Sequence, residues 1–388
     1  MKAFSTPYRE KLRRIDPCVL ICALLLSLIS CLMLFGGRNY LRNGTRLFIM
    51  QVGATVIGII AMIIISTIDY EVVLKKFWIP CAVFSVGILA FTLKFGVAVG
   101  TNRSWLDLGF MTVQPSEFVK TTFIVTFAKH LDLVKKDINK IWHLAGLGLH
   151  AGVVLFLLLK SGDLGVTLVF CGAAAIMLFC AGLSAFYFLG VFGALFIAIP
   201  YVWPHLELYQ QERIIYGFNP EGDPLDTGMQ PLQGKSCVAN GGFFGRGFSG
   251  AENYKTLYSA ESDFSFSTVC EMFGMLGGMI VIILLAVLVV RIFMIARSAR
   301  KDAGSFICVG VAAFIIIQSI ENIGMCLAML PVVGITLPFI SGGGSSTLAM
   351  YLLMGMVQSV ASHRVKYFFE REGTGMSRAA ADNAEAVI

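Results

Sequence analysis

The stretch Cys18–Phe35, CVLICALLLSLISCLMLF, is 18 residues long and contains no charged side chain. A run of this length and composition is long enough to cross the hydrocarbon core of a bilayer as one helix. The basic opening Met1–Arg14 precedes it, and no small-residue cleavage site follows it. The stretch is therefore predicted to be a membrane-spanning helix rather than a signal peptide that is removed.

The rest of the chain repeats this composition. Of 388 residues, 57% are hydrophobic and 14% are charged, whereas soluble domains have about 45–50% and about 25%. Apolar windows predict an all-α polytopic membrane protein with about ten transmembrane helices in a membrane domain of residues 16–362. These windows lie near residues 16–36, 47–68, 77–98, 113–131, 142–159, 164–182, 185–203, 264–295, 305–329 and 341–362.

The distribution of lysine and arginine predicts the orientation. With the N-terminus inside, 19 of these residues fall in cytoplasmic segments and 10 in outer segments, as the positive-inside rule requires. Both termini are therefore predicted to be cytoplasmic, including segment 1–15 and a disordered tail at 363–388. Residues 204–262 become one long extracytoplasmic loop between spans seven and eight, and their aromatic side chains indicate an ordered, functional loop. The net charge of +6 is explained by basic cytoplasmic loops and indicates no nucleic-acid partner.

The ten cysteines do not form a recognisable site. All but Cys237 lie in or beside apolar windows, where cysteine behaves as a small hydrophobic residue. No CxxC motif or Cys/His cluster occurs, so neither a disulfide framework nor a structural zinc site is predicted. No organic cofactor is expected.

Ionisable residues inside membrane windows are costly, and they mark candidate sites. Glu117 and Lys120 stand three residues apart in the fourth window, so they share a helix face and can form an ion pair. Such a pair could simply hold this helix in the bundle, or it could form the charged floor of a cavity for a polar headgroup. The two interpretations are compatible.

Two aspartates precede predicted helices. Asp163 lies in the short turn before the sixth window, and Asp263 precedes the eighth. Each could cap its helix, because a carboxylate accepts hydrogen bonds from the free N–H groups of the first turn. Glu271 follows Asp263 by two helical turns on the same face, and two stacked acids suggest a polar cleft with Asp263 at its rim. A carboxylate there could act as a general base or a metal ligand.

Two glycine-rich runs also have two interpretations. Residues 240–247 (NGGFFGRG) and 341–346 (SGGGSS) match no Walker or Rossmann pattern, because no strand precedes either. Their backbone N–H groups could bind a phosphate. Small residues also let helices pack closely in lipid.

Several separated blocks resemble the SEDS family, the RodA, FtsW and SpoVE group of bacterial cell-wall polymerases. The resemblance extends over roughly residues 12–365. Its blocks are 102–109 (NRSWLDLG), 114–120 (QPSEFVK), 162–165 (GDLG), 211–214 (QERI), 219–225 (NPEGDPL), 262–264 (SDF), 322–325 (NIGM) and 337–346 (LPFISGGGSS). Between Asp223 and Gly247 the family pattern fits without a gap.

The resemblance implies a glycosyltransferase that polymerises lipid II into β-1,4-linked glycan at the outer face of the bacterial cytoplasmic membrane. It implies that Asp263 is the general base, and it also makes Asp263 a candidate metal ligand. A divalent cation, Mg²⁺ or Mn²⁺, would stabilise the pyrophosphate leaving group, and the implied partner is a class B penicillin-binding protein. The implied substrate-binding residues are Arg103, Glu117, Lys120, Asp163, Arg213, Gln233, Lys235, Glu271 and Ser341.

Alternative functions remain at this stage. The motifs favour the RodA branch, which serves cell elongation and shape, over the division and sporulation branches. A lipid II flippase would also place charges in the membrane, although the long outer loop and the lack of visible inverted repeats disfavour a transporter. A scaffold for division proteins is a third alternative, in which acid-to-amide changes would have no effect in cells.

Overall fold

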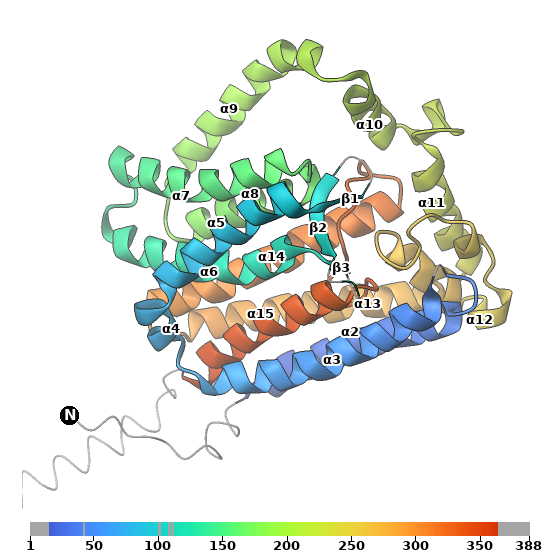
Figure 1. Ribbon diagram of the computed structural model, residues 1–388, viewed down its shortest axis with the longest axis horizontal. Coiled ribbons are helices and arrows are strands. Elements are labelled where there is room, and N and C mark those ends of the chain that lie inside the picture. The colour runs from blue at the N-terminus through green and yellow to red at the C-terminus, as the bar shows by residue number, and fades with distance from the viewer. Residues whose placement is uncertain (1–14, 42, 100–101, 108, 110–111, 364–388) are drawn as a thin grey trace, which may run out of the picture.

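The computed structural model describes residues 15–363 apart from residues 42, 100–101, 108 and 110–111. The predicted terminal segments 1–15 and 363–388 lie outside this part of the chain except for Ile15 and His363. The long helices form one bundle, and the described chain begins and ends at the same end of it (Figure 1). We call this the terminal end. The opposite end, which carries residues 204–262, is the loop end.

Each of the ten predicted windows falls on a helix. They are α2 (Pro17–Gly37), α3 (Gly44–Thr67), α5 (Trp78–Phe95), α6 (Pro115–Val134), α7 (Ile141–Lys160), α8 (Leu164–Cys180), α9 (Ala185–Val202), α13 (Ser265–Arg297), α14 (Asp302–Cys326) and α15 (Gly344–Ser362). In the described residues, α2, α3, α5, α7, α9, α13 and α14 are long and apolar enough to cross a membrane, and α8 is a shorter apolar helix. The chain is an all-α membrane protein, as predicted.

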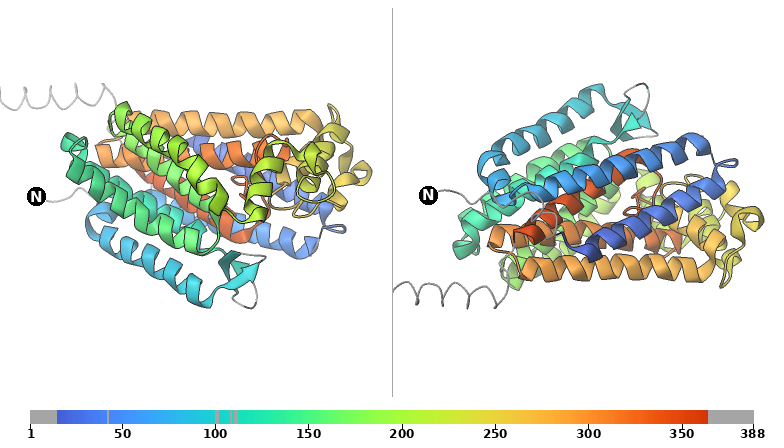
Figure 2. Two further views of the ribbon diagram at one scale, coloured as in Figure 1. Left: turned by 90° about the horizontal axis from the view of Figure 1, so that it is seen from above. Right: turned by 90° about the horizontal axis from the view of Figure 1, so that it is seen from below.

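Two of the ten helices, α6 and α15, are more polar, and most of their residues are buried. Nearly every residue of α15 is buried, and this helix packs mainly against α3. Figure 2 shows α15, coloured red, between the other helices in both views. A helix that is surrounded by other helices needs no apolar outer surface, and its small and polar residues can contact its neighbours.

Helix α9 is the opposite case. It has no buried residue, and in Figure 1 it rises away from the bundle toward α10. It is anchored near its N-terminus, where the Tyr187 hydroxyl donates a 2.8 Å hydrogen bond to the carbonyl of Asn139 and the Phe179 and Phe188 rings pack at 6.0 Å. An apolar helix exposed on all sides is suited to contact with lipid.

The segment after α5 differs from the prediction. The third window was expected to continue to residue 98, but α5 ends at Phe95 and three short antiparallel strands follow, β1 (Val97–Val99), β2 (Asn102–Asp107) and β3 (Thr112–Val113). The N–H of Arg103 donates to the carbonyl of Ser161 at 2.9 Å. This bond attaches the small sheet to the turn before α8.

The long loop is ordered around short helices. It contains α10 (Leu208–Phe218), α11 (Met229–Gly241) and α12 (Gly247–Gly250), together with the 3-10 turns η2 (Trp203–His205), η3 (Pro220–Gly222) and η4 (Asn253–Lys255). Helix α11 packs against the first half of α13. At the terminal end, the remaining short elements are α4 (Tyr70–Lys76) and η1 (Lys135–Asp137).

The first glycine-rich run packs against a kink in α13. Gly274 interrupts this helix with a φ of 74°, and the N–H groups of Met275 and Leu276 donate instead to the carbonyls of Gly242 and Phe243, at 2.8 and 3.1 Å. A Cβ at Gly245 or Gly274 would collide with the backbone of the other segment. The close-packing interpretation therefore describes this run.

Asp16 ties three helices together at the terminal end. Its carboxylate accepts hydrogen bonds from both Nε and Nη2 of Arg291 in α13, with the shortest at 2.7 Å. Its backbone N–H and carbonyl bond the side chain of Gln358 in α15 at 2.8 and 2.9 Å. The start of α2 is thereby fixed to α13 and α15, since each polar group in this cluster has a partner.

Candidate active site

Asp263 lies at the loop end, two residues before α13 begins, and its backbone is held from two directions. The side-chain amide of Asn322 in α14 donates to the Asp263 carbonyl at 2.7 Å. The Ser341 hydroxyl, from the loop before α15, donates to the Ser262 carbonyl at 2.6 Å and lies 2.9 Å from the Ser265 hydroxyl. The position of Asp263 is therefore fixed by segments that lie far from it in sequence.

Asp263 is half-buried. Burial raises its pKa to about 6; a hydrogen bond from Ser262 opposes this shift, while the negative charges of Glu261 and Asp163 add to it. A Cβ at Gly334 would be 3.5 Å from Oδ2 of Asp263, so the loop between α14 and α15 passes directly beside the carboxyl group. A carboxylate with a pKa near neutrality is suited to proton transfer.

Asp163 caps helix α8, as one of its two interpretations predicted. Its Oδ1 accepts a hydrogen bond from the N–H of Val166 at 3.1 Å, and its Oδ2 accepts one from the Gln114 amide at 3.0 Å. Burial raises the pKa of this carboxyl group, and these two hydrogen bonds oppose the shift. Asp163 is close enough to affect the titration of Asp263, so the two aspartates belong to one polar region.

Glu117 and Lys120 form the predicted ion pair in α6. The Lys120 Nζ lies 2.7 Å from Oε1 of Glu117, and the two side chains are only 1% and 2% exposed. Their charges also influence the titration of Asp163, which places the pair next to the same region. Glu117 Oε2 and the neighbouring Ser116 hydroxyl have no hydrogen-bond partner among the described residues. The described residues therefore leave part of this pair's hydrogen-bonding capacity unused.

The predicted cations and Gln233 are distributed around this region. A Cβ at Gly234 would contact Phe264, so Gln233 and Lys235 in α11 flank the contact between α11 and the Asp263 segment. Lys235 is more than half exposed and lies 4.0 Å from Glu221. Arg103 is exposed on β2. Arg213 belongs to α10, and its side chain lies outside the described part of the structure.

Ser341 and Glu271 are fully buried. Besides the bonds above, the Ser341 hydroxyl accepts the N–H of Leu337 at 2.7 Å. The Glu271 carboxylate accepts the N–H groups of residues 252, 253 and 254 and the amide of Asn240, at 2.8–3.1 Å. Glu271 was expected to line an open cleft together with Asp263, but α11 and the 252–254 turn cover it. Contact of either residue with substrate stays a prediction.

We expect Glu271→Gln to destabilise the loop end. An amide would replace one acceptor oxygen with an NH₂ group facing backbone N–H donors, and the charge that strengthens these bonds would be lost. The free energy of unfolding should fall by about 2–4 kcal/mol. Thermal melting of the detergent-purified protein measures this. Glu252→Gln is the matched control, because that side chain is 77% exposed; equal melting of the two variants would contradict the anchoring role.

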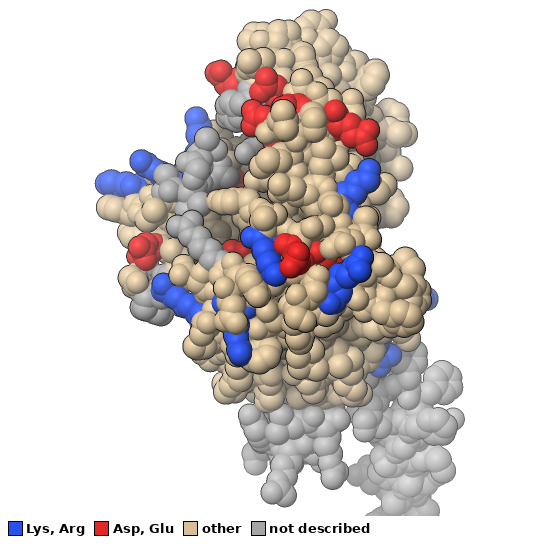
Figure 3. Space-filling view, turned by 90° about the vertical axis from the view of Figure 1, so that its right-hand side faces the viewer, with Lys and Arg blue, Asp and Glu red and all other residues tan. Residues whose placement is uncertain are grey.

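A polar cavity of about 420 Å³ lies between α10 and α11. Its lining includes Glu212, Asp226, Thr227 and Gln230, and the apolar Val332 closes one side. Figure 3, which views the loop end, shows several acidic side chains gathered on the upper part of this face.

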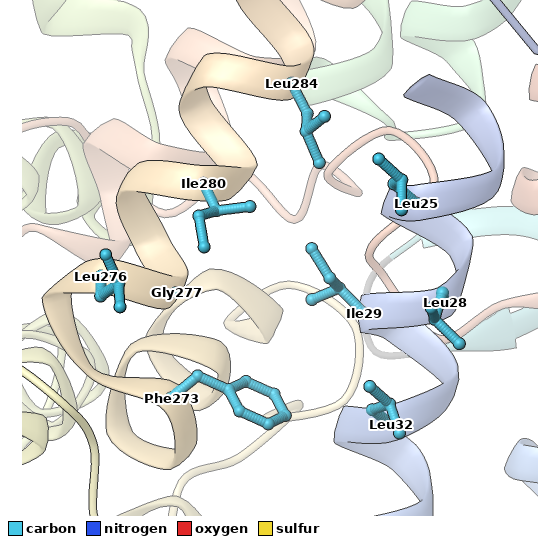
Figure 4. A pocket seen from close by; sticks show the side chains of 9 residues that line it. All are labelled: Leu25, Leu28, Ile29, Leu32, Phe273, Leu276, Gly277, Ile280 and Leu284. Atoms are coloured by element: carbon cyan, nitrogen blue, oxygen red, sulfur yellow. The ribbon is translucent and has the colours of Figure 1, made fainter. Parts of the chain in front are cut away.

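A groove of about 380 Å³ between α2 and α13 is entirely apolar. Figure 4 shows its lining, including Leu28 and Ile29 from α2 and Phe273 and Ile280 from α13. With no polar side chain among its lining residues, it offers nothing that could transfer a proton or stabilise a pyrophosphate. This groove is therefore not a candidate for a site that needs polar groups.

No group of three His, Cys, Asp or Glu side chains within the described ranges is arranged to hold a metal ion. Both oxygens of Asp163 already accept hydrogen bonds. A role of Asp263 as a metal ligand stays a prediction. A complete metal cage built by the described residues is not supported.

Sequence reasoning did not single out Asn322 or Gly334 as site residues. Asn322 is a polar residue in the apolar window of α14, and this was a usable signal, because buried amides in membrane helices are expected to bond neighbouring segments. Gly334 has a φ of +71°, a conformation that favours glycine. Its proximity to Asp263 depends on a contact between residues 71 positions apart, which no local pattern reveals.

Comparison with known proteins identifies the family. A model of the FtsW, RodA and SpoVE family, described as cell cycle protein, matches residues 16–366. The chain belongs to this family. Stage V sporulation protein E of Bacillus subtilis (strain 168) is 35% identical over 317 residues, which are 79% of this chain and 84% of that protein. Peptidoglycan glycosyltransferase MrdB of Escherichia coli (strain K12) is 30% identical over 365 residues, 90% and 94% of the two chains.

Solved structures agree with this assignment. A chain from a peptidoglycan synthase complex, solved to explain the structural coordination of polymerization and crosslinking, superposes with a TM-score of 0.80 at 26% identity and covers 91% of this chain and 99% of its own. The rod shape determining protein RodA of Thermus thermophilus shares the fold, with a TM-score of 0.68 at 22% identity over 91% and 98% of the two chains. This FtsW/RodA/SpoVE protein is a peptidoglycan glycosyltransferase of the cytoplasmic membrane.

Proposed function

We propose that the protein polymerises lipid II at the outer face of the cytoplasmic membrane, with Asp263 as the general base. The observation that carries this proposal is a carboxyl group fixed at the loop end of the bundle, with its pKa raised to about 6 by burial. Lipid II keeps its isoprenoid tail in the bilayer, so its sugars are held at the membrane surface. A site at one end of the helices meets them there.

The reaction requires the transfer of one proton. A sugar hydroxyl of the acceptor attacks the anomeric carbon of the donor, and a new C–O bond forms as the bond to the pyrophosphate oxygen breaks. The hydroxyl proton passes to the Asp263 carboxylate, and the undecaprenyl pyrophosphate leaves with the electron pair. The bound proton is later released to water. General-base catalysis of this kind contributes about 10²- to 10⁴-fold to a rate.

The leaving pyrophosphate is anionic, so positive charge near it lowers the barrier. The described candidates are Lys235, on the helix that packs against Phe264, and Arg103, whose backbone bonds Ser161; both side chains are exposed. A divalent cation supplies further positive charge when it is bound with the pyrophosphate. Arg213 remains a candidate from the sequence.

The orientation and the biological role follow from the same proposal. Both termini would be cytoplasmic, in agreement with the excess of basic residues predicted for that side. Residues 219–220 and 233–235 favour a RodA-like role in elongation and cell shape, with a division or sporulation role as the alternative. A class B penicillin-binding protein would cross-link the new glycan, since a solved structural relative comes from a complex that coordinates polymerization and crosslinking.

The proposal is tested by incubating the detergent-purified protein with lipid II and separating the products by size. We expect glycan polymer to form, EDTA to lower the rate, and Mg²⁺ or Mn²⁺ to restore it. Addition of a class B penicillin-binding protein should make the product cross-linked. A flippase needs no such chemistry and would give no polymer in detergent, so the absence of polymer under all of these conditions would reject the proposal.

A further inference from the structure

Asn322 joins two segments of the candidate active site. Its side chain is fully buried in α14. Both N–H groups of its amide are used: one donates to the Asp263 carbonyl and the other to the Ile335 carbonyl, each at 2.7 Å. These acceptors lie 59 and 13 residues away in the sequence. A single side chain thus connects the backbone of Asp263 to the loop between α14 and α15.

This loop passes between two acidic groups. Next to Ile335, Gly334 lies beside the Asp263 carboxyl group, where a Cβ would be 3.5 Å from Oδ2. On the other side, a Cβ at Gly165 would be 2.5 Å from the Val333 carbonyl, so the loop also contacts the first turn of α8, which Asp163 caps. The position of this loop therefore decides what lies next to the Asp263 carboxyl group and how far that group is from the first turn of α8.

Other groups near Asp263 do not replace this connection. The Cys326 thiol is 3.7 Å from the Asp263 carbonyl and is a weak donor. Ser341 bonds Ser262, Ser265 and Leu337, which fixes the residues beside Asp263. Asn322 alone among the described contacts bonds both Asp263 and the residue next to Gly334.

We propose that Asn322 is a positioning residue, which holds the carboxyl group of Asp263 at a fixed place and depth for proton transfer. The inference rests on the proposed function of Asp263 as the base. Loss of the amide leaves two buried carbonyls without a donor, and the two segments can then separate. A displacement of a fraction of an ångström is enough to slow a reaction that requires aligned groups.

Release of the Asp263 segment by loss of the Asn322 amide should change the pKa of Asp263. Loss of a residue with only a structural role would not have this effect. In the intact site, burial is the main cause of the raised pKa of Asp263, with Glu261 on its own segment and Asp163 before α8 contributing negative charge. Cys326 on α14 also faces it. If the segment is released, the carboxyl group can reach water, and its pKa should move down toward the ordinary value.

The test uses Asn322→Leu, which has similar volume, and Asn322→Ala, which leaves room for water. In the lipid II assay we expect kcat to fall about 10- to 100-fold, KM to change less than about threefold, and the acid limb of the pH profile to move to lower pH. Gln318→Leu is the matched control. Gln318 is a buried amide one turn earlier on α14 and makes only a 3.5 Å contact with the Thr336 carbonyl, so its acid limb should stay in place.

The outcomes separate this inference from the function on which it rests. An unchanged acid limb in both Asn322 variants overturns the inference, whether or not their activity falls, as does failure of both variants to fold. An active Asp263→Asn variant rejects Asp263 as the base, which is a failure of the proposed function. An inactive Asp263→Asn variant together with wild-type behaviour of both Asn322 variants rejects only the positioning role.

Discussion

Replacing Asp263 with asparagine is expected to lower the rate of glycan polymerisation by about 10²- to 10⁴-fold. The amide has nearly the same shape as the carboxyl group, so the contacts of Asn322 and Ser341 with the adjacent backbone carbonyls can persist. What is lost is the group that accepts the proton of the attacking hydroxyl. The initial rate of polymer formation from lipid II measures the effect.

The pH dependence of the same reaction identifies the titrating group. Only ionised Asp263 can accept a proton, and its pKa is raised to about 6. The rate of the wild-type enzyme should therefore be nearly constant above pH 7 and fall about tenfold per pH unit well below pH 6. The residual rate of Asp263→Asn should lack this acid limb.

Stability should change in the opposite direction to activity. Because the pKa of Asp263 is higher in the folded than in the unfolded protein, the folded state binds this proton more tightly. Its stabilising effect is complete below the ordinary carboxyl pKa and is lost as the pH rises through about 6. Asp263→Asn, which cannot ionise, should thus melt at or above the wild-type temperature at pH 7.5. The difference should disappear at pH 4.

Glu252→Gln is the control for these measurements, because it is an acid-to-amide change in the same loop at a side chain that is 77% exposed. It should polymerise lipid II at the wild-type rate. Folded Asp263→Asn protein with normal activity would remove this carboxylate from the chemistry, whatever the control shows.

The helices could be predicted from sequence because lipid imposes a simple rule. In α2 and α13, the apolar runs are long enough to cross the hydrocarbon core of a bilayer, so the bounds of both helices could be estimated to within a few residues. The three strands between residues 97 and 113 were missed because each is only two to six residues long, too short for a clear alternation of polar and apolar side chains. The exposed position of α9 was also not predictable, because composition does not show whether an apolar helix contacts protein or lipid.

The candidate site was predictable where the evidence was local. Glu117 and Lys120 are three residues apart on one helix, and Asp163 directly precedes α8, so pairing and capping were both foreseen. Contacts between distant segments were not. The partners of Glu271 come from residues 240 and 252–254. The spacing of Asp263 and Glu271 along one helix could not show that this loop covers Glu271.

The buried ion pair of α6 is expected to show large effects when either partner is changed alone. Lys120→Met leaves the Glu117 carboxylate without its partner, and Glu117→Gln leaves an unpaired ammonium group, at positions that are 1% and 2% exposed. An uncompensated charge in such a site costs about 3–5 kcal/mol of stability. Thermal melting of the purified single variants should show strong destabilisation.

The double variant Glu117→Gln with Lys120→Met removes both charges and should recover most of this stability, to within about 1 kcal/mol of wild type. The matched control is the Lys129 and Asp132 pair on the same helix, which is 3.8 Å apart and partly exposed. Single changes there should cost less than about 1 kcal/mol. Both pairs have a spacing of three residues, so the difference between their losses of stability measures the effect of burial.

Activity of the double variant then decides between the two roles of this pair. Glu117 Oε2 has no partner in the described structure, and Lys120 has two N–H groups beyond the one that bonds Glu117. Groups left incomplete beside Asp163 are expected to bind the polar headgroup or its water molecules. The stable double variant should therefore polymerise lipid II at least about tenfold more slowly than wild type. A wild-type rate from this folded protein would instead show that the pair only holds α6 in the bundle.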